Sequence, residues 1–183
     1  MRMVKILVGD SIHEDGVKML QDAGFHVDLE TSITPEDLIK KISGYDAIVV
    51  RSRTKVKKEV FEATMDLKVV ARAGVGLDNV DLVIAKERGV EVVNSPEAPS
   101  NAVAELIIGL MFSLARNIPQ AHSTMKQGQW EKKRLTGFEI KGKTMGIIGL
   151  GRIGHLVAQK AKALGMNLLI YNRTRDRVCL LYT

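Results

Sequence analysis

Residues 143–174 read KTMGIIGLGRIGHLVAQKAKALGMNLLIYNRT, and this stretch decides the fold. A short apolar run leads into three glycines with the spacing G-x-G-x-x-G, namely Gly149, Gly151 and Gly154. A helical pattern follows, and a second apolar run covers residues 167–171. Strand, glycine turn, helix and strand within about 30 residues are the context in which such a turn receives a dinucleotide.

Each glycine of the turn has a separate physical role. The first permits a tight turn, the second lets the backbone approach a pyrophosphate, and the third allows the helix to pack closely on the strand. The phosphates would face the N-terminus of the helix, where backbone amides point outward. The alternative is a strand-to-helix turn that holds no ligand.

The residues after the second strand predict which dinucleotide binds. NAD sites place an acidic residue there to accept hydrogen bonds from the ribose hydroxyls. This chain has Asn172, Arg173 and Thr174 instead. Asparagine lacks the charge that would repel a 2′-phosphate, and Arg173 offers charge-assisted hydrogen bonds to that group. The expected cofactor is NAD or NADP, with NADP favoured.

Five short β-rich runs recur upstream, near Lys5, His26, Asp46, Leu67 and Val90. Helical patterns lie between them, and several of these patterns close on a glycine. Strands that alternate with helices every 20 residues or so are typical of a parallel sheet covered by helices on both faces. The sequence therefore predicts an α/β fold.

Two loops follow the third and fourth of these runs. The first contains Arg51 and Arg53, and the second contains Arg72, Gly74 and Gly76. Ligands of open α/β sheets bind outside the carboxyl ends of the strands. Arginines combined with backbone N–H groups freed by glycine form a site for a carboxylate or a phosphate. The alternative for each arginine is a surface charge in solvent.

Two prolines break this pattern after the fifth run, and a long amphipathic helix is predicted over residues 101–117. Ser100 or Asn101 would cap its start, and Pro119 would end it. Residues 120–143 form a polar connector without a strong period.

Composition excludes several classes of function. The chain has 183 residues, a net charge of +6 and 4% aromatic residues. Its basic residues are scattered among acidic ones, so we expect no nucleic-acid partner, and small anionic molecules account for the excess charge. The longest apolar run, 106–115, is too short to cross a membrane. The four histidines and the single Cys179 do not have the spacing of metal ligands, so no metal is expected. A single cysteine and the lack of a recognisable signal peptide favour the cytoplasm as the expected location.

Four stretches together resemble the D-2-hydroxyacid dehydrogenase family, in its D-3-phosphoglycerate dehydrogenase branch. They are VVRSRTKV (49–56), ARAGVGLDNVDL (71–82), residues 89–130 and residues 142–166. The resemblance extends from residue 1 to about residue 174.

The resemblance also implies a domain organisation. A flavodoxin-like, parallel-sheet substrate domain would span residues 1–98, and an inter-domain and dimerisation helix residues 99–120. Residues 121–183 would form the first part of an incomplete Rossmann domain that binds NAD(P). In that family the substrate lies against the nicotinamide in the cleft between the two domains.

Carried over residue by residue, the resemblance assigns roles to the loops. The amides around Gly74 and Val75 would hold the substrate carboxylate, with Val75 also on the nicotinamide side. Arg152 and Ile153 would offer their amides to the pyrophosphate. Asn172 departs from the family's usual aspartate, which weakens the case for strict NAD use. The predicted substrate-binding residues are Arg51, Ser52, Arg53, Arg72, Gly74, Val75 and Gly76, and the predicted cofactor-binding residues are Val75, Gly149, Gly151, Arg152, Ile153, Gly154, Asn172, Arg173 and Thr174.

The family's reaction is hydride transfer between a D-2-hydroxy acid and NAD(P), used in serine biosynthesis. Its catalytic arginine, glutamate and histidine have no counterpart before Thr183. We therefore expect this chain, read as a truncated relative, to be inactive alone. We also expect a homo-oligomer, a dimer or larger, because the strand at 167–171 would otherwise leave an open edge and apolar faces.

Two other functions fit parts of the sequence. A non-catalytic nucleotide-binding or subunit-pairing regulatory module would use the same turn and the long helix. A phosphate-binding, receiver-like domain fits the first hundred residues but leaves the glycine turn unexplained.

Overall fold

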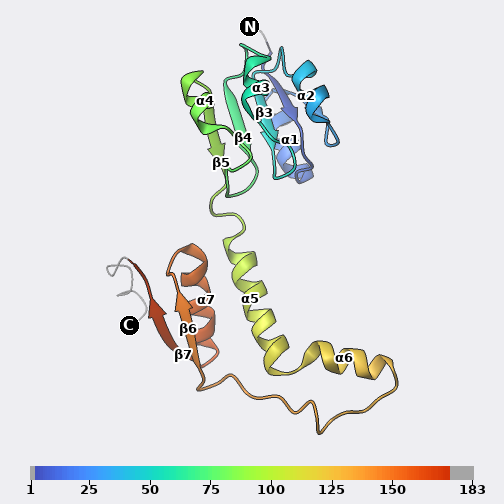
Figure 1. Cartoon of the computed structure of the whole chain (residues 1–183), viewed down its shortest axis with the longest axis vertical. Coiled ribbons are helices and arrows are strands. Elements are labelled where there is room, and N and C mark those ends of the chain that lie inside the picture. The colour runs from blue at the N-terminus through green and yellow to red at the C-terminus, as the bar shows by residue number, and fades with distance from the viewer. Residues whose placement is uncertain (1–2, 174–183) are drawn as a thin grey trace. The chain divides into compact units, whose positions relative to one another are not determined.

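The computed structural model describes residues 3–173, which divide between Ala98 and Pro99 into two compact units (Figure 1). Each unit contains a parallel β-sheet with helices packed on it. The two units are described separately below.

The first unit contains a five-stranded sheet in the order β2-β1-β3-β4-β5, and all four neighbouring pairs are parallel. From β1 the chain first adds β2 on one side and then β3, β4 and β5 on the other, which is the flavodoxin-like order. The predicted α/β class and parallel sheet are confirmed. The strands are β1 (Lys5–Val8), β2 (His26–Leu29), β3 (Ala47–Val50), β4 (Val69–Arg72) and β5 (Glu91–Asn94).

Four helices connect these strands, and local chemistry explains where two of them begin. Thr34 caps the second helix by accepting a hydrogen bond from the Asp37 N–H at 3.1 Å, and Asp81 caps the fourth in the same way. The third helix has five residues, too few to give a recognisable period in the sequence. The helices are α1 (Glu14–Asp22), α2 (Pro35–Lys41), α3 (Lys58–Glu62) and α4 (Leu82–Glu87).

The core of this unit lies between the central strands and the helices that cover them. Leu7 on β1 and Ile48 on β3 have no exposed surface, and Phe61 on α3 is 1% exposed. Each such side chain contributes about 1.5–3 kcal/mol relative to an exposed one. This packing holds the carboxyl ends of the strands, from which the candidate loops emerge.

Strand β2 forms one edge of the sheet and carries polar side chains. The Asp28 carboxylate lies 3.2 Å from Nε2 of His26 and accepts a 2.8 Å hydrogen bond from the Tyr45 hydroxyl. Partial burial, reinforced by the bond to Asp28, raises the pKa of Tyr45 to about 12. Polar groups on an edge strand oppose pairing with a foreign sheet.

The second unit contains two helices followed by a β-α-β element. Strands β6 and β7 pair in parallel from Thr144 opposite Asn167 to Ile148 opposite Tyr171. Ala158 on α7 is fully buried together with Ala104 on α5. The elements are α5 (Ser100–Ala115), α6 (Ile118–Lys126), β6 (Thr144–Ile148), α7 (Arg152–Ala163) and β7 (Asn167–Tyr171).

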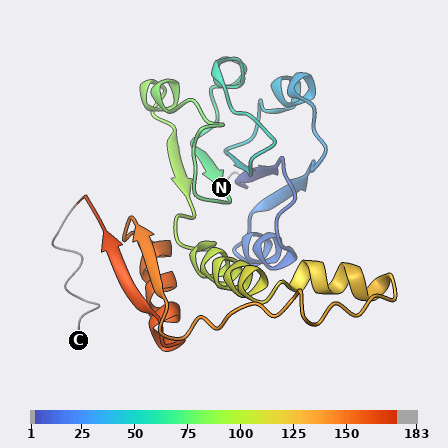
Figure 2. The same ribbon diagram turned by 60° about the horizontal axis from the view of Figure 1, so that its bottom comes forward.

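The long helix differs from its prediction at both ends. Pro99 is the N-cap and makes no side-chain hydrogen bond, while Ser100 is already helical and buried. At the other end Asn117 adopts a left-handed conformation (φ 53°), and α6 then starts with Pro119 in its first turn, where proline needs no N–H partner. The chain therefore bends by 61° between the helices (Figure 2), and the expected connector begins as a helix.

Within residues 3–173, no single helix has the length and apolar character required to cross a membrane. The bent pair α5 and α6 meets those requirements when taken together, on length and composition alone.

Candidate functional site

The glycine turn follows β6 and is anchored to the end of β7. Gly149 has φ +96°, a conformation that favours glycine, and its N–H donates to the Tyr171 carbonyl at 2.8 Å. The N–H of the buried Leu150 donates to Oδ1 of Asn172 at 3.2 Å. The predicted ribose-binding position therefore lies directly beside the turn.

The other two glycines differ in how much space surrounds them. A Cβ built on Gly154 would lie 2.2 Å from the Gly149 carbonyl oxygen, so the helix packs against the turn with no room for a side chain. A Cβ on Gly151 would meet no heavy atom within 4 Å, so the backbone there is open to approach. Helix α7 begins at Arg152 without a side-chain cap. Close packing at the third glycine and open space at the second are what a dinucleotide turn needs, so these residues fit such a cofactor.

A hollow of about 400 Å³ borders the turn on one side. Ile153 and Val157 of α7 and Ile107 of α5 contribute to its apolar lining. An apolar surface offers nothing to a charged group, so a diphosphate would lie on the open side at Gly151. Of the three residues predicted after β7, Arg173 is the last that the structure describes, and Thr174 lies outside the described residues.

The two arginine loops leave the carboxyl edge of the first sheet on neighbouring strands. Val50, the last residue of β3, pairs with Arg72 at the end of β4. Arg51 therefore emerges at the same edge as Arg72. Strands β1 and β3 lie side by side at the point where the strand order reverses, and ligands of such sheets bind outside that point.

The two arginines of the first loop have different surroundings. Arg53 directs its guanidinium back across the sheet edge, donating to the carbonyls of Gly9 (2.6 Å), Thr31 (2.8 Å) and Ile33 (3.0 Å). Its Nη2 also lies 3.0 Å from Oδ1 of Asp10. The exposed side chain of Arg51 makes, among the residues that the structure describes, a single long bond, 3.4 Å to the Ser11 carbonyl. Arg53 thus cross-links the first unit, and its contact with a ligand stays a prediction.

In the second loop, Arg72 folds over Gly74. A Cβ on Gly74 would lie 1.9 Å from Nη1 of Arg72, so the guanidinium rests on the glycine backbone. The Nε of Arg72 is buried and has no hydrogen-bond partner among the described residues. The Gly74 N–H donates to the Arg72 carbonyl at 2.8 Å, and Asn94 holds the Val75 carbonyl at 2.6 Å. The Gly74 N–H is therefore engaged within the loop, and the contact of the amides around Gly74 and Val75 with a substrate carboxylate stays a prediction. Ser52 is exposed in the first loop.

Comparison with known families matches residues 6–176 to the D-isomer specific 2-hydroxyacid dehydrogenase catalytic domain. The chain belongs to this family. The family resemblance inferred from the motifs is therefore confirmed. The chain is similar to members of the expected branch: D-3-phosphoglycerate dehydrogenase of Methanocaldococcus jannaschii is 53% identical over 170 residues, and the human enzyme of that name is 44% identical over 168. These alignments cover 93% and 92% of this chain but 32% of each relative. The chain spans about a third of the length of these D-2-hydroxyacid dehydrogenases.

Solved structures of similar proteins agree with the fold. A 3-phosphoglycerate dehydrogenase of Entamoeba histolytica with bound NAD⁺ is 32% identical, with a TM-score of 0.73 over 96% of this chain and 57% of its own. A Thermus thermophilus protein is 30% identical, with a TM-score of 0.84 over 93% of this chain and 57% of its own.

Sequence analysis missed three polar residues that shape the first arginine loop: Asp10, Thr54 and Asn79. All three are buried, with exposed fractions of 3%, 6% and 4%. Asp10 comes two residues after β1, at the carboxyl edge where the strand order reverses, and that position was the available signal. Its partners lie 41 and 44 residues away, which a local pattern does not reveal.

Proposed function

We propose that this chain binds a nicotinamide dinucleotide at the Gly149–Gly154 turn and a small anionic D-2-hydroxy acid at the carboxyl edge of the five-stranded sheet. The reaction served would be hydride transfer of the D-3-phosphoglycerate dehydrogenase type. One observation carries the proposal, namely the pairing of a closed third glycine with an open second glycine in the turn. The relatives at 44–53% identity that bear the D-3-phosphoglycerate dehydrogenase name support the substrate class.

The chain's own residues would bind and orient both ligands. The cofactor, when bound, supplies the group that accepts or gives the hydride. Open backbone at Gly151 and the start of α7 would receive the diphosphate. Arg51 and Arg72 would hold the phosphate of the substrate, and the amides of Val75 and Gly76 its carboxylate. Because no residue among these 183 is assigned the family's catalytic roles, we expect binding without turnover from this chain alone.

Asn172 is proposed to favour NADP over NAD. A carboxylate about 4 Å from the 2′-phosphate would cost about 1–4 kcal/mol near a protein surface, and asparagine avoids that cost. In a fluorescence titration we expect tighter binding of NADPH than of NADH, and Asn172→Asp should weaken NADPH binding by about tenfold or more.

The control for this substitution lies at the other end of the same strand. Asn167→Asp makes the same change at the first residue of β7, where the side chain donates to the Gly142 carbonyl, and should leave the preference unchanged. Wild-type binding of NADH as tight as that of NADPH would contradict the assignment. Failure to bind either nucleotide would contradict the proposed function itself.

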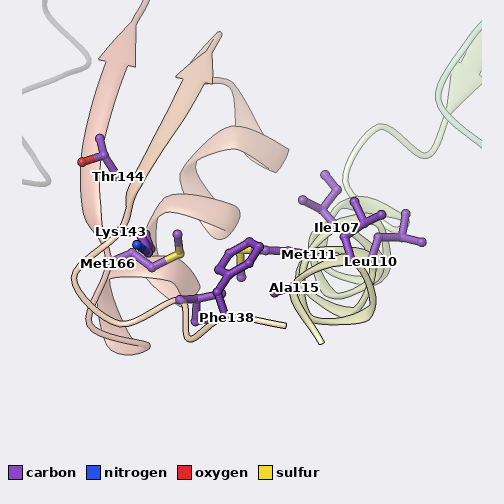
Figure 3. Close-up of a pocket in the computed structure, with 10 residues that line it drawn as sticks. Ile107, Leu110, Met111, Ala115, Phe138, Lys143, Thr144 and Met166 are labelled. Carbon is purple, nitrogen blue, oxygen red and sulfur yellow. The ribbon is translucent and has the colours of Figure 1, made fainter. Parts of the chain in front are cut away.

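An apolar stripe on α5 supports assembly into a homo-oligomer. Leu106, Leu110 and Leu114 lie four residues apart and are 61%, 54% and 77% exposed. Beside them, α5 and the segment before β6 enclose a hollow of about 610 Å³, in which Phe138 lies between Met166 and Met111 (Figure 3). Apolar patches of this kind mark protein interfaces.

We expect the purified chain to elute as a dimer or larger species in size exclusion with light scattering. Leu110→Glu should shift it to the monomer, because a buried unpaired carboxylate opposes association. Met19→Glu on α1, where the methionine is 73% exposed, introduces the same charge away from the stripe and should have no effect. A monomeric wild type would exclude the proposed interface.

A further inference from the structure

A buried carboxylate lies beneath the first arginine loop and accepts hydrogen bonds from it. Oδ2 of Asp10 accepts from the Arg51 N–H at 2.6 Å and from the Thr54 N–H at 3.1 Å. Oδ1 accepts from the Thr54 hydroxyl at 2.9 Å and lies 3.0 Å from Nη2 of Arg53. Both carboxylate oxygens of Asp10 thus interact with residues 51–54.

A second buried side chain holds the carbonyls of the same loop. Nδ2 of Asn79 donates to the carbonyls of Arg51 and Thr54, both at 2.7 Å. Asp10 therefore binds donors of residues 51 and 54, and Asn79 binds acceptors of the same two residues. Hydrogen bonds in a buried setting are costly to leave unmade, so this arrangement defines one backbone path for the loop.

We propose that Asp10 is a positioning residue, whose carboxylate fixes the backbone of residues 51–54 and so sets the direction in which Arg51 leaves the sheet edge. The proposal rests on the proposed function, in which Arg51 faces an anionic substrate. Asp10 itself lies behind the loop and would not touch the ligand. Arg53 acts with it, because its guanidinium brings positive charge to the buried carboxylate and ties the loop to the residues after β1 and β2.

The difference between a carboxylate and an amide side chain at position 10 provides the test of this proposal. An ionised carboxylate accepts at both oxygens, whereas asparagine accepts at one and places an NH₂ group at the other. In Asp10→Asn the NH₂ group would face either the two backbone amides or the Arg53 guanidinium, all of which are donors. The Thr54 hydroxyl keeps the Gly9 carbonyl, 3.1 Å away, as an acceptor. The loop should open more often, while the β-sheet beneath it keeps its own hydrogen bonds.

A matched control is available at the opposite edge of the same sheet. The buried Asp46 comes directly before β3, at the amino end of the strand that leads into the loop, where it accepts from the Lys5 N–H at 3.0 Å and lies 3.3 Å from Nζ of Lys68. Asp46→Asn makes the same chemical change to a buried carboxylate with an amide donor and a cationic partner. Comparison of the two variants therefore distinguishes a general loss of stability from a specific change in the position of the loop.

The experiment measures amide hydrogen exchange by NMR in the free full chain and the affinity for D-3-phosphoglycerate by calorimetry. Asp10→Asn should speed exchange at the Arg51 and Thr54 amides by at least about tenfold and weaken binding by about the same factor, which corresponds to the loss of one hydrogen bond to a charged group. Asp46→Asn should change neither quantity.

Wild-type exchange rates at both amides in Asp10→Asn would overturn the positioning role. If the wild type binds no D-3-phosphoglycerate, the proposed substrate is wrong, while the exchange rates still decide the role of Asp10. If Asp10→Asn does not fold, Thr54→Val removes the hydroxyl, which donates to Oδ1 of Asp10 at 2.9 Å and to the Gly9 carbonyl at 3.1 Å, and faster exchange at the Thr54 amide is then expected. An unchanged rate in that variant would also overturn the proposal.

Discussion

Gly154→Ala is expected to destabilise the second unit by about 2–4 kcal/mol and to abolish dinucleotide binding. The added Cβ would lie 2.2 Å from the Gly149 oxygen and 3.2 Å from the Gly149 carbon, both backbone atoms that no rotamer change can move aside. Helix α7 must therefore shift away from the turn by about 1 Å, because ordinary contacts need about 3.4 Å or more. Urea unfolding and an NADH titration measure the two effects.

Substitutions at two further glycines distinguish an effect on protein stability from an effect on nucleotide binding. Gly151→Ala places its Cβ in open space, so stability should fall by no more than the ~1 kcal/mol that a poorer N-cap costs. Its nucleotide affinity should nevertheless drop by tenfold or more, because the methyl group enters the space through which the diphosphate approaches. Gly146→Ala in β6, also in open space, should leave both quantities unchanged. Undiminished binding by Gly151→Ala would place the diphosphate elsewhere.

The features that could be predicted from sequence are those set by neighbouring residues. The five strands near Lys5, His26, Asp46, Leu67 and Val90 are present because short apolar runs between turn residues specify buried parallel strands. The turn after β6 forms for the same local reason, since glycine spacing sets its backbone. Alternation of strand and helix then restricts the sheet to few topologies.

The features that sequence could not supply depend on distant partners. Arg51 and Arg53 look equivalent in RSRT, two positions apart in one loop. Arg53 differs because it reaches the carbonyl of Gly9, 44 residues away, and that of Thr31, 22 residues away. The 61° bend after α5 likewise depends on one left-handed residue, Asn117, in a segment whose composition permits a straight or a bent path.

The three arginines at the sheet edge should respond differently to removal of charge. Arg51→Met and Arg72→Met are each expected to weaken D-3-phosphoglycerate binding by about 10- to 100-fold, the cost of a hydrogen bond to a charged group. Neither should lower the melting temperature. Among residues 3–173, the Arg51 guanidinium makes one 3.4 Å bond, and the buried Nε of Arg72 has no acceptor, so loss of the Arg72 side chain removes an unsatisfied group.

Arg53→Met should differ from both by lowering stability, because its guanidinium is engaged by the protein. Loss of its bonds to three carbonyls and of its ion pair with Asp10 should lower the free energy of unfolding by about 1–3 kcal/mol, less than for a fully buried group since half of the side chain is exposed. Calorimetric binding and thermal melts of the three variants test both patterns. A melting temperature unchanged in Arg53→Met would mean that the cross-link does not hold the sheet edge. Wild-type affinity in Arg51→Met would make Arg51 a surface charge in solvent, and the substrate phosphate would then depend on Arg72.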